Sequence, residues 1–401
     1  MKYVYFFGDN KTEGKKELKD LLGGKGANLA EMANISIPIP PGFTISTVAC
    51  KRYNEENNKL TNEMQSEIQQ NITKLEKSTN KTFGDPKNPL LISVRSGAAV
   101  SMPGMMDTIL NLGLNDNVVE GLADQSNNPQ FAWDSYRRFI QMFGNVVMGI
   151  PHEKFESILE QIKEKTNTTY DMDLTVYALK EIIKKKKKLI KNETNESFPQ
   201  NVNEQLTQSI QAVFNSWNNQ RAIKYREINN IKGLEGTAVN VQTMVFGNMG
   251  KDSATGVCFT RNPATGENTF YGEYLINAQG EDVVAGIRTP QQIQTLKDQM
   301  PTLYDQLLST CKKLEKHYKD MQDLEFTIQN KKLYMLQTRT GKRTAQAAIN
   351  IAVDMVNEGL ITKEQALFRI NPKQLSQLLH KQLDKNTQHN DQYLTNGLPA
   401  S

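Results

Sequence analysis

Cysteine, histidine and long apolar runs are all scarce in this sequence. The three cysteines among 401 residues are widely spaced, so neither a disulfide framework nor a CxxC metal site is available. The four histidines form no HxxxH pair, which argues against a zinc hydrolase. No apolar run approaches the roughly 20 residues of a membrane span, and Tyr3–Phe7 is too short for a signal sequence. We therefore expect a cytoplasmic protein with no membrane partner.

The chain also lacks a large excess of either charge. Its 48 Lys+Arg and 44 Asp+Glu leave a net charge of +4, too little for a general nucleic-acid binder. The run Lys184–Lys188 is a local basic segment that we place at the end of a helix before a polar loop. A solvated helix terminus explains it better than a nucleic-acid contact. We expect no nucleic-acid partner.

The chain is long enough for two or three domains at roughly 150 residues each. Residues 1–115 read as a first α+β lobe, residues 116–229 as a helical insert, and residues 230–340 as a second α+β lobe. No regular βαβ alternation argues for a doubly wound parallel sheet, so the fold class is α+β. The predicted strands are Tyr3–Phe7, Phe43–Ser46, Leu90–Arg95, Thr237–Phe246, Gly256–Thr260, Thr269–Ile276, Asp323–Gln329 and Leu333–Thr338.

Residues 341–401 read as helices followed by a linker. Gly359 stands where a helix C′ glycine belongs, and Thr362 to Gln365 spells a capping box that opens the next helix. Residues 380–396 are polar and nearly free of apolar side chains, which is typical of a linker.

Two segments of the first lobe have the composition of a phosphate site. Gly23–Gly26 precedes an amphipathic helix, so backbone N–H groups and the Lys25 ammonium would converge on an anion. A buried β-run delivers Arg95 into a small-residue loop that continues to Gly104–Thr108. The GxxxxGK[ST] spacing is absent, so a plain turn, a structural arginine and core methionines remain the competing interpretations.

Gln242, Thr243 and Met244 end the strand that follows the helical insert. The edge of such a strand can offer backbone N–H and C=O groups to an adenine ring. By pattern alone, a plain sheet strand is the favoured interpretation.

Asp323 and Glu325 alternate with apolar residues, so both carboxylates lie on one face of a strand. With Gln337 and Arg339 on the next strand they suit Mg²⁺ and a phosphate chain, although solvated surface residues are the competing account. A two-residue turn would set Glu325 opposite Leu336. A shared metal site needs Glu325 opposite Gln337, so we predict a three-residue loop at 330–332.

Taken together, several strings resemble the pyruvate, phosphate dikinase family, in order along nearly the whole chain. They are Gly23–Leu29, Ser93–Gly97, Met102–Thr108, Phe259–Pro263, Asn277–Gly286 and Leu336–Arg339. The resemblance implies an ATP-grasp fold, in which two α+β lobes clasp ATP. It also implies transfer of the β- and γ-phosphates of Mg-ATP to a histidine on a separate swivelling domain, within the overall conversion of ATP, pyruvate and phosphate to AMP, phosphoenolpyruvate and diphosphate.

The resemblance assigns roles to individual positions. Lys25, Arg95 and Arg339 would hold the phosphates as catalytic residues, while Glu325 and Gln337 would ligate Mg²⁺ with Asp323 close by. A loop would wrap the phosphates and a strand end would border the adenine; these residues are Gly104, Met105, Met106, Asp107, Thr108, Gln242, Thr243 and Met244. One departure is Ala254, where the family usually has glycine, and it puts the mobility of that loop in doubt.

The family's phosphohistidine motif and its pyruvate-binding barrel are not in the sequence. We expect an N-terminal portion of a longer enzyme, which needs those domains as partners and which the resemblance implies to be a homodimer. A phosphoenolpyruvate synthase-type portion and a nucleotide-binding module without chemistry are the alternatives. A mere sensor would not need the whole set of phosphate and metal residues, so its presence favours the enzyme.

Overall fold

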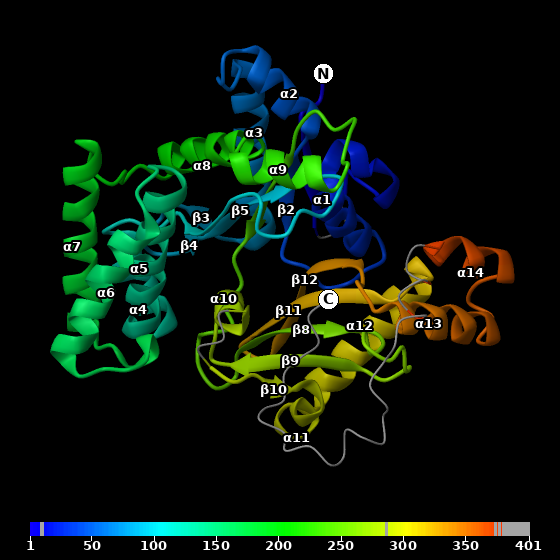
Figure 1. Ribbon diagram of the computed structural model, residues 1–401. Coiled ribbons are helices and arrows are strands. Elements are labelled where there is room, and N and C mark those ends of the chain that lie inside the picture. The colour runs from blue at the N-terminus through cyan, green and yellow to red at the C-terminus, as the bar shows by residue number, and fades with distance from the viewer. Residues whose placement is uncertain (9–11, 285–287, 373–374, 376–377, 379–401) are drawn as a thin grey trace. The chain divides into compact units, whose positions relative to one another are not determined.

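A computed structural model describes residues 1–8, 12–284, 288–372, 375 and 378 (Figure 1). The chain divides into two compact units, Met1–Met249 and Gly250–Ser401. The predicted linker 380–396 lies outside the described residues, as do the last two residues of the string Asn277–Gly286. Both units are mixed α and β with antiparallel main sheets, which confirms the predicted fold class.

The first unit contains a five-stranded sheet in the order β1-β2-β7-β5-β6, in which every neighbouring pair is antiparallel. A separate parallel pair, β3 and β4, precedes β5 in the sequence. The bounds are β1 Val4–Phe7, β2 Gly42–Ile45, β3 Thr82–Phe83, β4 Pro89–Leu90, β5 Ile92–Gly97, β6 Thr108–Leu112 and β7 Ala238–Thr243.

The first unit has nine α-helices within its described residues: α1 to α3 lie between the first strands of the chain, and α4 to α9 occupy residues 118–228. Their bounds are α1 Lys19–Asn34, α2 Thr47–Glu55, α3 Asn62–Thr79, α4 Val118–Ser126, α5 Pro129–Val146, α6 His152–Thr166, α7 Val176–Thr194, α8 Val202–Ser216 and α9 Gln220–Ile228, with single 3₁₀ turns at Lys16–Leu18 and Asp171–Asp173.

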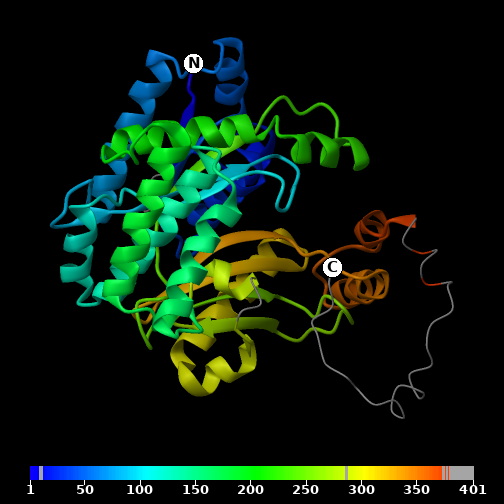
Figure 2. The same ribbon diagram turned by 60° about the vertical axis from the view of Figure 1, so that its left-hand side comes forward.

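Helix α8 covers one face of the first sheet with its apolar side (Figure 2). Leu206, Ile210 and Phe214 are buried in the same cluster as Val94 and Val241 of the strands. Because strand side chains alternate, the residues between these apolar positions project from the opposite face of the sheet. That opposite face is polar, and the candidate site lies on it.

The lysine run is not a solvated helix terminus, and that prediction is wrong. The run lies inside α7, which continues to Thr194. Lys186 is completely buried, donates a hydrogen bond to Gln141 Oε1, and lies 6.0 Å from the centroid of the Phe155 ring. Burial, followed by the nearby Arg137 guanidinium, holds the pKa of the Lys186 ammonium well below its usual range. Helical periodicity, which turns one lysine inward, outweighs composition here.

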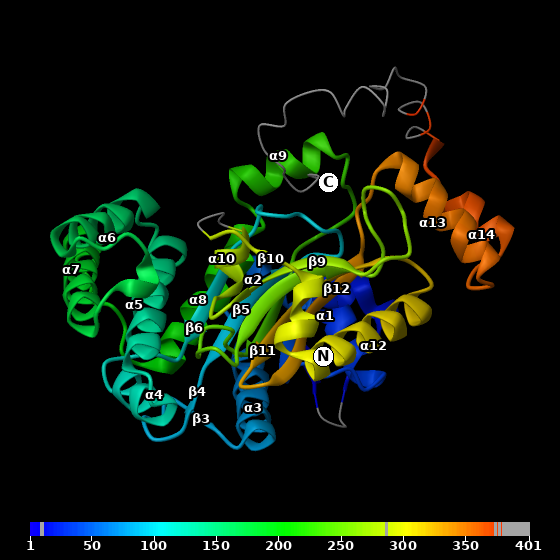
Figure 3. The same cartoon turned by 90° about the horizontal axis from the view of Figure 1, so that it is seen from below.

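The second unit contains a five-stranded sheet in the order β10-β9-β8-β11-β12. Helix α12 packs along one face of it, against β11 and β12 (Figure 3). The bounds are β8 Ala254–Phe259, β9 Tyr271–Ile276, α10 Gly280–Val284, β10 Gln291–Gln292, a 3₁₀ turn Ile293–Thr295, α11 Leu296–Gln299, α12 Pro301–Tyr318, β11 Gln322–Gln329, β12 Lys332–Thr340, α13 Ala345–Asn357 and α14 Lys363–Arg369.

The β11–β12 hairpin has the predicted pairing of Glu325 with Gln337, but its turn differs from the predicted one. Its turn has two residues, Asn330 and Lys331, both with positive φ, so the predicted three-residue loop is wrong. A register shift after Glu325 leaves Leu336 as an extra residue on β12. Beyond this bulge Glu325 opposes Gln337 and Asp323 opposes Arg339, as the shared site required.

The last described helices confirm two predictions about helix ends. Gly359 follows the end of α13 with φ 72°, and Thr362 and Gln365 form a reciprocal capping box at the start of α14. A fully buried Arg261 fastens these helices to the sheet, because its guanidinium donates hydrogen bonds to Glu315 of α12 and to Glu358.

Replacing Lys186 should stabilise the protein in a pH-dependent way. The unfolded chain keeps this proton up to about pH 10.4, whereas the folded chain releases it at lower pH, so wild-type stability rises with pH through that window. Lys186→Met removes the cost, and we expect a gain of about 1–3 kcal/mol at pH 7 that shrinks toward pH 10. Urea unfolding at several pH values measures this. The exposed neighbour Lys185→Met is the control, and an equal gain for both variants would contradict the explanation.

Candidate functional site

The candidate site residues of the first unit depend on a close contact between the start of α1 and the end of β5. Gly23 interrupts the helix with φ 67° and ψ 170°. A Cβ at Gly23 would lie 1.6 Å from the carbonyl oxygen of Gly97, and the Gly24 N–H donates to Ala98 O at 2.9 Å. A glycine at position 23 is therefore required both by its φ and by the space.

This contact brings Lys25 and Arg95 to the same end of the sheet. The Cβ of Lys25 is 3.6 Å from the position that a Cβ on Gly97 would occupy. Arg95 is two residues before Gly97 on β5 and therefore shares its face. The register places Thr108 of β6 on one side of Arg95 and Asn240 of β7 on the other. Lys25, Arg95 and Thr108 therefore lie near one another at one end of this sheet.

Asn240 belongs to this face, and the sequence analysis missed it. Its side chain is 1% exposed and its Oδ1 accepts a hydrogen bond from Thr44 Oγ1 at 2.9 Å. Its Nδ2 has no hydrogen-bond partner within the described part of the chain. The only signal was that Asn240 alternates in phase with Gln242 along the strand, a pattern that indicates a polar face.

The predicted adenine-binding edge is not an edge. β7 is the central strand, paired with both β2 and β5. The Thr243 N–H donates to Pro41 O at 2.9 Å and the Met244 N–H to Leu91 O at 2.8 Å, while the Gln242 side chain donates to Pro40 O. Those backbone donors are used inside the sheet, because the strand is covered on both sides. The contact of Gln242, Thr243 and Met244 with adenine stays a prediction.

The loop between β5 and β6 carries the predicted phosphate-wrapping residues. Gly104 has φ 70° with open space around the position of a Cβ. Met105 and Met106 are partly buried and pack on a small apolar cluster, so the competing interpretation of core methionines is correct in part. The carboxylate of Asp107 is paired with Arg221 of α9. Thr108 begins β6.

The candidate site residues of the second unit lie on the face of its sheet that carries Asp323 and Glu325. Arg339 Nε donates to Asp323 Oδ2 at 2.7 Å, and Gln337 Nε2 donates to Glu325 Oε1 at 3.0 Å. Burial raises the pKa of Asp323, against the opposing influence of Arg339. The four side chains therefore interact in two pairs across β11 and β12.

The donor atoms on this face suit a hard cation. Gln337 Oε1 is buried and has no hydrogen-bond partner among the described residues, which leaves an acceptor oxygen for a ligand. Beside it stands the Glu325 carboxylate, and carboxylate and amide oxygens are the ligands that Mg²⁺ takes. No group of three His, Cys, Asp or Glu side chains in the described ranges is placed to hold a metal ion.

Two further residues on this face escaped the sequence analysis. β9 sets Tyr271 opposite Phe259 and Glu273 opposite Val257, and those two residues of β8 lie opposite Asp323 and Glu325. Burial raises the pKa of Glu273. Only the strand register reveals this neighbourhood.

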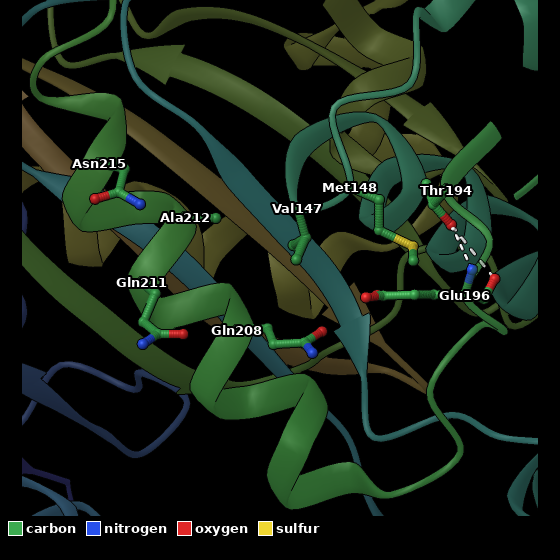
Figure 4. A pocket seen from close by; sticks show the side chains of 8 residues that line it. All are labelled: Val147, Met148, Thr194, Glu196, Gln208, Gln211, Ala212 and Asn215. Atoms are coloured by element: carbon green, nitrogen blue, oxygen red, sulfur yellow. Dashed lines mark hydrogen bonds between the residues drawn. The ribbon is translucent and has the colours of Figure 1, made fainter. Parts of the chain in front are cut away.

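Two hollows of the first unit lie apart from the predicted residues. One, of about 350 Å³, is lined by side chains of α8 such as Gln208 and Gln211, with Val147, Met148 and Glu196 across from them (Figure 4). The other, of about 700 Å³, is lined by residues of α2 and by the N-terminal Met1 and Tyr3. None of the predicted site residues lines either hollow.

Comparison with known proteins identifies the family. The sequence model of a family described as "Pyruvate phosphate dikinase, AMP/ATP-binding domain" matches residues 19–63, 59–308 and 302–360. The chain belongs to this family. It is 56% identical over 400 residues to pyruvate, phosphate dikinase 1, chloroplastic, of Oryza sativa subsp. japonica, covering 100% of this chain and 42% of that protein.

Two other dikinases show the same coverage. Identity is 54% over 401 residues to pyruvate, phosphate dikinase, chloroplastic, of Mesembryanthemum crystallinum, covering 100% of this chain and 42% of the relative. It is 55% over 398 residues to pyruvate, phosphate dikinase 2 of Zea mays, covering 99% and 45%. The chain thus spans less than half the length of these dikinases and corresponds to their ATP-binding portion. Within the described ranges, no helix is long and apolar enough to cross a membrane.

The contact at Gly23 can be tested by substitution. Gly23→Ala should destabilise unit 1 by about 3 kcal/mol, because the methyl group would overlap the Gly97 carbonyl and the residue would keep a positive φ. Gly24→Ala is the matched control, since its nearest neighbour is Ala98 O at 3.4 Å. Thermal and urea unfolding compare the two, and equal stabilities would refute the contact.

Proposed function

We propose that the chain binds Mg-ATP and passes its β- and γ-phosphates to a histidine of a swivelling domain, as the nucleotide-dependent step of a pyruvate, phosphate dikinase. One observation carries the proposal: the family match extends over residues 19–360, and within it the predicted cations and metal ligands stand on polar sheet faces. Pyruvate, phosphate, the histidine domain, the pyruvate-binding barrel and a homodimer are the substrates and partners of the complete enzyme in this proposal.

Residues of the first unit would bind and orient the phosphates. Lys25 stands beside the glycine contact and supplies an ammonium, while Arg95 supplies a planar guanidinium from the same sheet face. The loop Gly104–Thr108 would bring backbone donors to the phosphate oxygens. Transfer of a phosphoryl group depends mainly on such positioning and charge stabilisation, because the protein contributes little covalent chemistry.

Residues of the second unit would hold the cation and the charge that develops during transfer. Glu325 and Gln337 would ligate Mg²⁺, which when bound offsets the negative charge of the polyphosphate. The Arg339 side chain is 40% exposed, while that of its partner Asp323 is 9% exposed. The buried carboxylate therefore orients the guanidinium, which stays accessible to solvent. An arginine held in this way can bind the transferring group, which is why we favour an enzyme over a sensor.

The compartment is a separate matter from the chemistry. The absence of a predicted disulfide framework supports a reducing compartment, and we propose the cytoplasm. The named relatives from Oryza and Mesembryanthemum are chloroplastic, whereas the name of the second Zea mays protein gives no compartment.

ATP binding is the first test of the proposal. Titration calorimetry with ATP and Mg²⁺ should show binding, and a saturating nucleotide should raise Tm by mass action. Lys25→Ala and Arg95→Ala should each weaken affinity about tenfold or more, because each removes a charge-assisted contact to phosphate. The exposed Lys59→Ala should bind as wild type does. No heat and no thermal stabilisation would refute the proposal.

The metal ligands are tested separately. Gln337→Ala should raise the Mg²⁺ concentration needed for half-maximal stabilisation by ATP about tenfold. The free energy of unfolding without ligand should change by less than about 1 kcal/mol. Gln292→Ala, an exposed amide on the edge strand of the same sheet, should leave both quantities unchanged. An unchanged Mg²⁺ dependence in Gln337→Ala would remove this residue from the metal site.

The transfer itself can be tested with the acceptor in trans. The chain, labelled ATP and Mg²⁺ should label a separately supplied histidine domain slowly, with saturation as the acceptor concentration rises, because only the effective concentration of a tether is missing. Arg339→Ala should abolish labelling and leave ATP binding nearly intact, since its contact acts mainly in the transition state. Absence of acid-labile, base-stable label at millimolar acceptor would mean that the chain binds nucleotide only.

A further inference from the structure

Helix α9 lies beside the loop between β5 and β6 (Figure 1). The helix has nine residues, Gln220–Ile228, and follows directly on the end of α8. Its contacts concentrate on residues 102–107, which precede and overlap the proposed phosphate-binding loop. This juxtaposition of a short helix and a functional loop has both a polar and an apolar component.

The polar component converges on Asp107. Arg221 Nη2 donates to one carboxylate oxygen of Asp107, and Asn219 Nδ2 donates to the other at 3.4 Å. The Asp107 N–H donates to Ser216 Oγ at 3.4 Å. Arg221 Nε also donates to the carbonyl oxygen of Met105 at 3.2 Å. One short stretch, 216–221, therefore holds both the side chain and the backbone of the loop.

The apolar component is a cluster that is distinct from the main core. Met102 of the loop is 6% exposed and packs with Trp217, Ala222 and Ala98, while Met105 and Met106 pack against its border. The guanidinium of Arg226 lies 3.9 Å from the Trp217 ring centroid and donates to the Trp217 carbonyl oxygen at 2.7 Å. Trp217 is thus fixed between α9 and the loop.

We call the contacts that residues 216–221 make with the loop the clamp. The position of Gly104 in the loop explains why the clamp matters. Its positive φ and the open space around it leave the backbone free of the steric restraint that a side chain and neighbours would impose. Residues 105–107, directly after it, are the ones that Arg221 holds. Without these contacts, the loop between Met102 and Thr108 would sample several conformations around Gly104, at an entropic cost to any ligand that needs one of them.

We propose that Arg221 is a positioning residue, which fixes the phosphate-binding loop through Asp107 and Met105 before ATP arrives. Asp107 then serves to anchor the loop, and its carboxylate charge, which would repel a phosphate, is matched by the guanidinium. This inference rests on the proposed function of the loop, although the clamp itself is a property of the protein without nucleotide.

Hydrogen exchange of the nucleotide-free protein tests the clamp, and calorimetry with Mg-ATP tests its consequence. Arg221→Ala should speed amide exchange in residues 102–108 about three- to tenfold and weaken ATP binding by a similar factor, the range of a partly exposed ion pair with an added charge-assisted hydrogen bond. Arg221→Lys should restore only part of both effects, because an ammonium cannot hold Asp107 and the Met105 carbonyl in the same fork.

Two further variants separate the clamp from general damage. Lys224 lies on the same helix, and its side chain is 71% exposed. Lys224→Ala should therefore leave amide exchange and ATP affinity unchanged. Asp107→Asn should resemble Arg221→Ala, and the double variant should be no worse than either single one, because both remove the same interaction.

Each outcome decides a distinct point. Faster exchange with weaker ATP binding in Arg221→Ala and in Asp107→Asn, but not in Lys224→Ala, supports the proposal. Unchanged exchange overturns the clamp, additive effects in the double variant overturn the pairing of Arg221 with Asp107, and faster exchange with unaltered affinity overturns the positioning role. If the wild-type chain binds no ATP, the proposed function fails and with it the positioning role, whereas exchange still shows whether the clamp exists.

Discussion

The candidate site of the first unit depends on the approach of two backbones at Gly23 and Gly97. Gly23 has a non-helical conformation within helix α1, and the carbonyl of Gly97 occupies the space that a side chain at position 23 would need. A Cβ on Gly26 would lie 2.6 Å from Thr44 Oγ1 and 2.8 Å from Asn240 Oδ1, two residues that lie side by side on β2 and β7. The position of Lys25 relative to Arg95 follows from these contacts, because helix and strand can meet so closely only without side chains between them.

The candidate site of the second unit depends instead on register. A single extra residue, Leu336, shifts β12 so that two acids, an amide and an arginine face one another in pairs. Without the bulge, the two-residue turn would place Glu325 opposite Leu336 and divide the set between the two faces of the sheet. The bulge, and not the turn type, therefore brings these four side chains to one face of the sheet.

The sequence predicted features that follow from local chemistry and missed those set by neighbours. The capping box at Thr362, the glycine at the end of α13 and the alternation of Asp323 with Glu325 are local, and all are confirmed. The burial of Lys186 and the central place of β7 depend on which elements pack beside them, which no single segment records. Asn330 and Lys331 adopt positive φ without a glycine, so the turn itself gave little signal.

In each unit, a carboxylate among the candidate site residues is matched by an arginine, but the two pairs are built in opposite senses. Asp323 is 9% exposed beneath an Arg339 that is 40% exposed, so the acid orients the arginine and leaves it accessible to an anion. Asp107 is 16% exposed and is held by an Arg221 that belongs to a neighbouring helix, so there the arginine orients the acid and its loop. In both cases the pair removes a negative charge that would repel a polyphosphate. Under the proposed function, an ion pair that fixes the geometry before the ligand arrives reduces the ordering that binding must accomplish, and the two pairs would share this role.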